Sequence, residues 1–176
     1  MIAVLRMGHR KSRDARLSTH CGLIARALGA DEIIYSGEED SGLLESIKRA
    51  GIRWGGKFSV SYEKNWRNTI EKFRRRKFLV VHLSMFGIPI QEKINTVRNR
   101  PRVLVLIGSE KVPGEVYGLS DLNLAVTSQP HSEAAALAIF LHEYFSGKEL
   151  AKKFPGAEIR IVPQEHGKKT LIRSKR

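Results

Sequence analysis

The sequence contains a single cysteine, Cys21, and no Cys-x-x-Cys pair. One thiol cannot form an internal disulfide, and a structural zinc site needs several clustered cysteine or histidine ligands. The six histidines do not supply them, because no two stand at His-x-x-x-His spacing on one expected helix. We therefore expect no disulfide and no metal, and we expect Cys21 to be a small buried residue and not a nucleophile.

Long hydrophobic runs are also missing. No apolar stretch approaches the roughly 20 residues that a membrane-spanning helix requires. The opening residues Met1–Arg6 lack the basic segment and the long apolar segment of a signal peptide. These absences favour a cytoplasmic protein that does not enter a membrane.

Acidic residues are few beside the basic ones. The chain has 31 Lys and Arg against 18 Asp and Glu, a formal net charge of +13. Five of the basic residues fall within 6–16, seven within 64–77 and six from Arg160 onward. One such cluster is equally well explained as a solvated face, but three clusters with so large an excess favour contact with the phosphates of a nucleic acid.

Short apolar runs rich in β-branched residues alternate with helical patterns along the chain. The expected strands are 2–5, 32–35, 78–83, 103–107 and 122–126, with an additional strand at 159–162. The expected helices are about 13–28, 42–50, 65–76 and 132–145. This alternation predicts an α/β fold with a mostly parallel sheet. A length of 176 residues fits a single domain, 1–176.

Three segments have more than one structural interpretation. The helix at 132–145 is apolar nearly all round over 133–141, which predicts either burial or a subunit interface. Residues 54–62 are compatible with a loop or a hairpin insert. The extension from about Pro163 is basic and poor in apolar residues, which is compatible with a mobile tail.

Residues 51–57 match the glycine and lysine spacing of a phosphate-binding P-loop. The next residue is Phe58, where a P-loop has the Ser or Thr that holds magnesium. The segment also follows an expected helix, whereas a P-loop follows a strand. We therefore reject a nucleoside triphosphate site here.

Polar or glycine-containing loops follow three of the expected strands. These loops are 82–87, 107–114 and 128–133. In open α/β sheets, ligands bind beyond the carboxyl ends of strands, so the three loops can converge on one crevice. Taken alone, this pattern indicates a ligand site of unspecified chemistry.

Two of these loops resemble the SPOUT methyltransferases. Residues 107–114 (IGSEKVPG) are similar to the Gly-x-Glu loop of that superfamily, and 122–138 to its last motif, a strand, a tight loop and an alanine-rich helix. The segments RMGHR, RDAR, TH, ARALGA, HLSMFG, GSEKVPGEVY and SQPHSEAAALA together resemble one family. That family is the archaeal tRNA ribose methyltransferases that act on the T-loop cytidine at tRNA position fifty-six. The resemblance covers nearly the whole chain apart from the basic tail.

This resemblance implies a SPOUT fold with a C-terminal deep trefoil knot and a homodimer. It implies tRNA as substrate and S-adenosylmethionine as cofactor. The residues expected to enclose the cofactor are Leu83, Gly108, Glu110, Lys111, Val112, Pro113, Gly114, Ser128, Gln129, Pro130, His131, Ser132, Glu133, Ala134 and Ala135. Considered alone, Gly108 and Gly114 are explained by the preference of turns for glycine. Within the whole motif, they favour close approach of the backbone to the ligand.

Related ribose methyltransferases use an arginine after the first strand for catalysis. In this sequence, the position that corresponds to that arginine falls near Leu23. Another residue must therefore have the catalytic role, and we expect it to be Arg16. Asp14 and His20 are the expected orienting or proton-accepting partners. Because arginine stays protonated under most conditions, a positioning role toward ribose or phosphate is as well supported as a role as base. Two other functional classes remain open, an RNA-binding module without activity and an enzyme acting on a nucleotide phosphate.

Overall fold

The computed structural model describes residues 1–108 and 112–173. Its main sheet has six strands in the order β3-β2-β1-β5-β4-β6, and every neighbouring pair is parallel. The strands are β1 (Ile2–His9), β2 (Glu32–Gly37), β3 (Ser59–Tyr62), β4 (Leu79–Pro89), β5 (Val103–Gly108) and β6 (Leu122–Ala125). The predicted α/β fold with a mostly parallel sheet is therefore confirmed.

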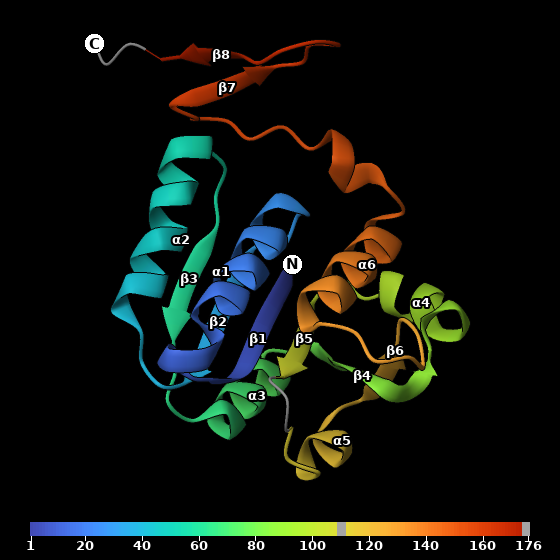
Figure 1. Cartoon of the computed structure of the whole chain (residues 1–176). Coiled ribbons are helices and arrows are strands. Elements are labelled where there is room, and N and C mark those ends of the chain that lie inside the picture. The colour runs from blue at the N-terminus through green and yellow to red at the C-terminus, as the bar shows by residue number, and fades with distance from the viewer. Residues whose placement is uncertain (109–111, 174–176) are drawn as a thin grey trace.

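Helices cover both faces of this sheet (Figure 1). One face, which includes Ile2 and Val4 of β1, packs against α1 (Lys11–Ala27), α2 (Ser41–Trp54), α4 (Ile90–Arg98) and α6 (Glu133–Phe145). The other face, which includes Ala3 and Leu5, packs against α3 (Trp66–Arg75) and α5 (Glu115–Leu119). Strands covered on both faces are apolar along their whole length, which explains the continuous hydrophobic runs in the sequence.

The five main expected strands and all four expected helices are present, although β1 and β4 run on to His9 and Pro89, and α4 and α5 were not expected. The expectation of a loop or hairpin insert at 54–62 is wrong for its second half, because β3 pairs in parallel with β2 at the sheet edge. The strand expected at 159–162 forms as β7 (Ile159–Val162), but it lies outside the main sheet. It pairs antiparallel with β8 (Lys169–Ile172), so part of the extension after Pro163 forms a strand, which its composition did not indicate.

The helix α6 is buried on one side and exposed on the other. Leu137, Phe140 and Leu141 are inaccessible to solvent, whereas Ile139 is 45% exposed. The sequence left burial and a subunit interface as alternatives for this helix. In the single chain, an apolar strip of α6 is in contact with solvent. Burial within the chain therefore explains only some of the apolar residues of this helix.

The strand β4 contacts β6 twice. Leu83 pairs with Leu124, and after an irregular stretch Ile88 pairs with the same residue. Gly87 lies in this stretch, and a Cβ there would stand 2.6 Å from the backbone C and O of Asn123. Glycine is therefore required where β4 bends closely around β6, at the edge of the sheet that carries the predicted ligand loops.

Candidate active site

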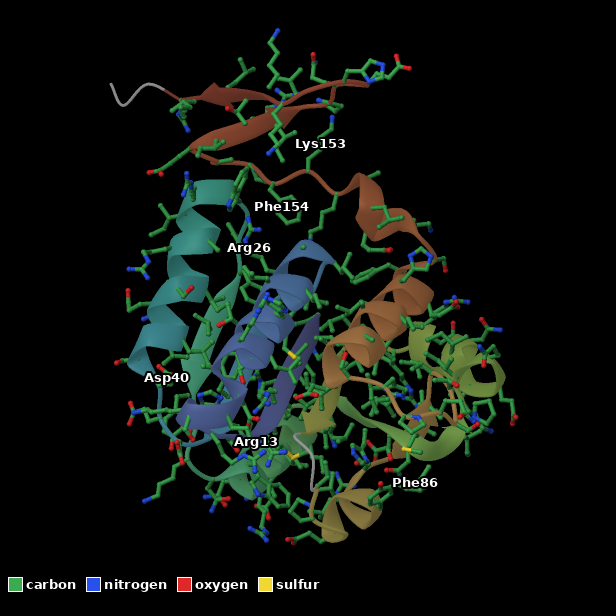
Figure 2. All side chains as sticks on the ribbon, viewed as in Figure 1. Arg13, Arg26, Asp40, Phe86, Lys153 and Phe154 are labelled. Atoms are coloured by element: carbon green, nitrogen blue, oxygen red, sulfur yellow. The ribbon has the colours of Figure 1, made fainter. Side chains whose placement is uncertain are left out.

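A cleft of about 540 Å³ opens at the carboxyl ends of β4 and β5, within the size range of small-molecule sites. All three loops singled out in the sequence contribute to it. The lining residues are His82, Leu83, Ser84, Met85, Phe86, Ile107, Gly108, Val112, Tyr117, Pro130, His131, Glu133 and Ala136. Phe86 is 79% exposed and marks one side of the opening (Figure 2).

Six of the residues expected to hold the cofactor line this cleft, namely Leu83, Gly108, Val112, Pro130, His131 and Glu133. Pro113 lines an adjoining pocket with Gly108 and Val112. Ser132 caps α6 by accepting a hydrogen bond from the Ala135 amide, and Ala134 is in the core. Gly114 precedes α5, and Ser128, Gln129 and Ala135 are exposed. Glu110 and Lys111 lie outside the described residues.

Gly108 permits the close chain approach that the motif indicated. A Cβ at this position would stand 1.9 Å from Val112 Cγ2, so a side chain here would displace the Val112 side chain. Val112 itself lines the cleft. The missing side chain of Gly108 therefore lets Val112 pack against the end of β5 as part of the cleft wall.

His82 places an unused hydrogen-bond acceptor at the cleft wall. Its Nδ1 donates to Asn123 Oδ1 at 2.9 Å, and Asn123 Nδ2 donates to the Tyr117 carbonyl at 3.0 Å. Burial lowers the pKa of His82, so the neutral ring is favoured. Its buried Nε2 has no partner within the part of the chain that the structure describes. A ligand with both apolar and polar groups, such as S-adenosylmethionine, fits a wall of this kind.

Arg6 connects the cleft to α1. Its side chain is completely buried, and its Nη2 donates to Glu133 Oε1 at 3.0 Å and lies 3.7 Å from Asp14 Oδ2. Arg10 Nε approaches the same Asp14 oxygen at 3.2 Å. In the sequence, Arg6 was part of a basic cluster and of the segment RMGHR, and no separate role was assigned to it. Its position one residue after the apolar run 2–5 of a buried strand was the signal that it faces the interior.

The three expected catalytic residues lie on different sides of α1. Asp14 faces inward and is 6% exposed, whereas Arg16 and His20, four residues apart, are both on the exposed side. Neither Arg16 nor His20 lines the cleft of its own chain. Leu23, also exposed, continues this side toward the end of the helix. Within one chain, Asp14 is linked to the cleft through Arg6, which bonds the lining residue Glu133, whereas Arg16 and His20 do not line the cleft.

Asp14 should make folding stability depend on acid pH. Burial alone would raise its pKa, but the hydrogen bond from Arg10 and the charges of Arg6 and Arg10 hold it below its ordinary value of 3.8. Its contribution is therefore complete above that value and is lost as pH falls through the lower folded pKa. We expect Asp14→Asn to cost about 1 to 3 kcal/mol near pH 7 and less in acid. Urea unfolding from pH 2 to 7 measures this, and parallel curves for the two proteins would contradict it.

Other reactive groups have structural environments. Cys21 is buried, and burial raises the pKa of its thiol to about 12, so it is not a ready nucleophile. Across residues 1–108 and 112–173, no group of three or more His, Cys, Asp or Glu side chains is placed to hold a metal ion. Within the same ranges, no helix is both long and apolar enough to cross a membrane.

Solved structures of RNA methyltransferases share this fold. The TrmH/SpoU tRNA modifying enzyme of A. aeolicus matches with a TM-score of 0.60 at 14% identity, over 84% of this chain and 75% of that chain. The SpoU methyltransferase AviRb of Streptomyces viridochromogenes, solved with AdoMet, matches with a TM-score of 0.61 at 14% identity, over 84% and 57%. The molecule therefore has the fold of the TrmH/SpoU methyltransferases.

Sequence comparison identifies the family. The model of the family described as tRNA ribose 2'-O-methyltransferase, aTrm56, matches residues 54–171. A tRNA (cytidine(56)-2'-O)-methyltransferase of Methanocaldococcus jannaschii is 49% identical over 178 residues, covering 99% of this chain and 98% of that protein. The enzyme of the same name from Methanopyrus kandleri is 48% identical over 166 residues, covering 94% and 93%. The chain belongs to this family of tRNA ribose 2'-O-methyltransferases, and the resemblance seen in its loop motifs is confirmed.

Proposed function

We propose that this protein transfers the methyl group of S-adenosylmethionine to the ribose 2'-hydroxyl of the cytidine at position 56 in the T-loop of tRNA. The observation that carries the proposal is the single cleft at the ends of β4 and β5, built from the three loops that carry the family motifs. Relatives named for this reaction are 48% and 49% identical to this chain over nearly its full length, which supports the proposal. The net charge of +13 suits a polyanionic substrate.

The chemistry divides between cofactor and protein. S-adenosylmethionine supplies a methyl group already activated on a sulfonium, so the protein must bind it, exclude water and align the ribose oxygen with the methyl carbon. Leu83, Ile107 and Val112 provide apolar walls, and Gly108 allows backbone groups to approach the ligand. Alignment of reacting groups can supply a large share of the rate acceleration.

Arg16 is the residue that we assign to the ribose end of the reaction. It either accepts the hydroxyl proton, which needs surroundings that favour a neutral guanidine, or holds the ribose and its phosphate in place. Asp14 is already paired with Arg6 and Arg10, which suits an orienting role and not that of a free base. His20, exposed and one turn from Arg16, is the alternative proton acceptor.

A homodimer would complete the site. Arg16 and His20 do not reach the cleft of their own chain, and they share the exposed side of α1 with Leu23. The helix α6 packs against α1 and exposes Ile139. We propose that these two helices form a two-fold interface that brings Arg16 of one protomer to the cleft of the other, because two-fold dimers are the commonest oligomers.

Disrupting this interface should abolish activity without removing cofactor binding. Leu23→Asp with Ile139→Asp places charge in an apolar contact, so we expect a monomer that has lost more than nine-tenths of its methyl transfer. Analytical ultracentrifugation and calorimetry with S-adenosylmethionine provide the readouts. Ile52→Asp, at a residue 63% exposed on α2, is the matched control and should stay dimeric and active. A fully active monomer at assay concentration contradicts the shared site.

The function itself is tested with unmodified tRNA transcript and S-adenosylmethionine labelled in the methyl group. We expect one methyl per tRNA, recovered as 2'-O-methylcytidine after nuclease digestion, and none when cytidine 56 is replaced by uridine. If the label is recovered at another nucleotide, the protein is still a tRNA methyltransferase, but the assignment of cytidine 56 as its target is wrong. Binding of tRNA without any transfer would instead support an RNA-binding module.

Three further features belong to the proposal. We place the single domain in the cytoplasm of an archaeal cell, where its tRNA substrate is found. We also propose that the C-terminal part forms a deep trefoil knot. The pairing of Leu124 with both Leu83 and Ile88, around a glycine that leaves no room for a side chain, supports a threaded arrangement of β4 and β6.

A further inference from the structure

A second recess lies at the opposite edge of the sheet from the cofactor cleft. It has an inner pocket of about 190 Å³, bordered by Ala30 and Asp31 before β2 and by Phe58 before β3. It continues into an outer groove of about 1080 Å³ under the β7–β8 hairpin. We call the two together the distal groove. The residues common to both parts are Arg26, Lys152, Lys153, Phe154 and Pro155.

The distal groove is preformed, because the hairpin is attached to the end of α2. The Gly56 amide donates to the Pro155 carbonyl at 2.8 Å, and the Glu158 amide donates to the Arg53 carbonyl at 3.1 Å. Gly55 has a φ of +75°, and a Cβ there would stand 2.6 Å from the Ala157 amide nitrogen. The hairpin lies at the end of the molecule away from α5 (Figure 1).

Arg26 is a buried cation in this groove, and the described part of the chain gives it no anionic partner. Its side chain lies beside Phe154 and near Lys153, between the hairpin and the helices (Figure 2). The residue is 8% exposed, its Nη2 donates to the Gly55 carbonyl, and its guanidinium lies 5.0 Å from the Phe154 ring centre. In the described part of the chain, its buried Nε has no hydrogen-bond partner and no carboxylate forms an ion pair with it.

This arrangement disfavours the charge on Arg26 while nothing is bound. Burial lowers the pKa of its guanidinium, because water is removed and no anion replaces it. A buried charge of this kind is costly unless it is paired. An anion that enters the groove would supply the missing partner of this guanidinium.

The remaining lining is basic and aromatic. Lys57 and Lys153 are exposed at the inner pocket, Arg160 lines the outer groove, and none of the three forms an ion pair among the described residues. The one carboxylate of the lining, Asp31, is engaged with the Ile2 amide at 2.7 Å. Trp54, 36% exposed, lines the outer groove. Cations beside an aromatic ring are typical of surfaces that follow an RNA strand.

The shape of the groove favours a polymer over a free nucleotide. Gly56, one of the two glycines that made residues 51–57 resemble a P-loop, packs with Gly55 against the linker 154–157. They are not arranged around an empty phosphate cradle. The groove instead runs on from Arg26 beneath the hairpin as far as Arg160 and Ile161.

We propose that the distal groove binds the phosphate backbone of the tRNA substrate, with Arg26 paired to one phosphate and Lys57 and Lys153 beside it. This inference rests on the proposed function. The helix α1 connects the two regions, because Arg16 and Arg26 are ten residues apart on it, about 15 Å along its axis. The groove would thus hold the RNA at a distance from the reacting ribose.

The test is the double variant Lys57→Gln with Lys153→Gln, which changes two exposed side chains and leaves Arg26 in place. Binding of unmodified tRNA transcript should weaken about tenfold at 150 mM salt, and the slope of log K against log salt should fall by about 1 to 2. Lys93→Gln with Arg100→Gln, on and just after α4, removes the same charge elsewhere and should change binding less than threefold. Affinity for S-adenosylmethionine should be the same in all three proteins.

A fluorescence experiment distinguishes the phosphates of tRNA from free inorganic phosphate as the ligand of the distal groove. Trp66→Phe leaves Trp54 as the only tryptophan and a reporter in the groove. We expect tRNA to change its emission and 10 mM inorganic phosphate to leave it unchanged. If phosphate alone changes the emission while the double variant binds tRNA normally, the groove is a free-anion site and the RNA assignment is overturned.

The two proposals fail in different ways. If the parent protein methylates tRNA and Lys57→Gln with Lys153→Gln binds tRNA as tightly as the parent, the groove assignment is wrong and the function stands. If the parent protein binds S-adenosylmethionine but has no affinity for tRNA, the proposed function fails and the groove assignment fails with it.

Discussion

Arg16→Ala is expected to lower the rate of methyl transfer to tRNA at least a hundredfold, the usual scale for losing a group that moves or positions a proton. Cofactor affinity should change less than twofold, because Arg16 is exposed on α1 and does not line the cleft of its own chain. Single-turnover kinetics with saturating tRNA measure the rate, and calorimetry measures the affinity. Lys11→Ala, at another exposed basic residue of the same helix, is the matched control and should stay active.

The lysine variant separates the two roles left open for Arg16. Arg16→Lys keeps the positive charge and loses the planar fork that can hold two oxygens. If lysine restores activity, Arg16 acts as a simple charge near phosphate, and His20 becomes the first candidate for accepting the hydroxyl proton. If it does not, the guanidinium geometry is required. Normal turnover by the alanine variant would refute the assignment and leave the cofactor cleft unaffected.

The buried strands and four of the helices could be predicted because their patterns are local, whereas α4 and α5 were not expected. Residues 2–5 and 103–107 are apolar without interruption, as befits central strands covered on both faces. The edge strand β3 gave no such signal, because half of its four residues are serine and only one neighbour, β2, pairs with it. The strand β7 was expected at 159–162, but its partner β8 was missed because the hairpin forms outside the main core. Its register is set by backbone pairing between β7 and β8 and not by burial.

The cleft could be anticipated from the sequence, because carboxyl ends of parallel strands meet at one edge of a sheet. What no local pattern gives is contact between distant segments. Arg6 and Glu133 are 127 residues apart, and Arg26 meets Phe154 because the linker before the hairpin packs against the end of α2. In the sequence both arginines are ordinary members of a basic chain. Their burial, which gives them their roles, is a property of the folded molecule.

Arg6→Met is expected to destabilise the protein by about 3 to 5 kcal/mol, the usual cost of removing one partner from a buried charge cluster. Methionine fills much of the same space, so the loss should come from charge and not from a cavity. Asp14 would keep Arg10, but Glu133 has only Arg6 as an ion-pair partner among the described residues. Urea unfolding near pH 7 with a constant m-value measures the effect.

A double-variant cycle shows whether the cluster acts through Glu133. Once Arg6 is gone, Glu133→Gln removes an unpaired carboxylate that is only 15% exposed, so Arg6→Met with Glu133→Gln should be more stable than Arg6→Met alone. Because Glu133 lines the cleft at the start of α6, the single variant Arg6→Met should also weaken binding of S-adenosylmethionine, as the loop before α6 loses its fixed position. Equal stability of the single and double variants would mean that Glu133 finds solvent when Arg6 is removed. The cleft would then be held by its own loops and not by the buried arginine beneath it.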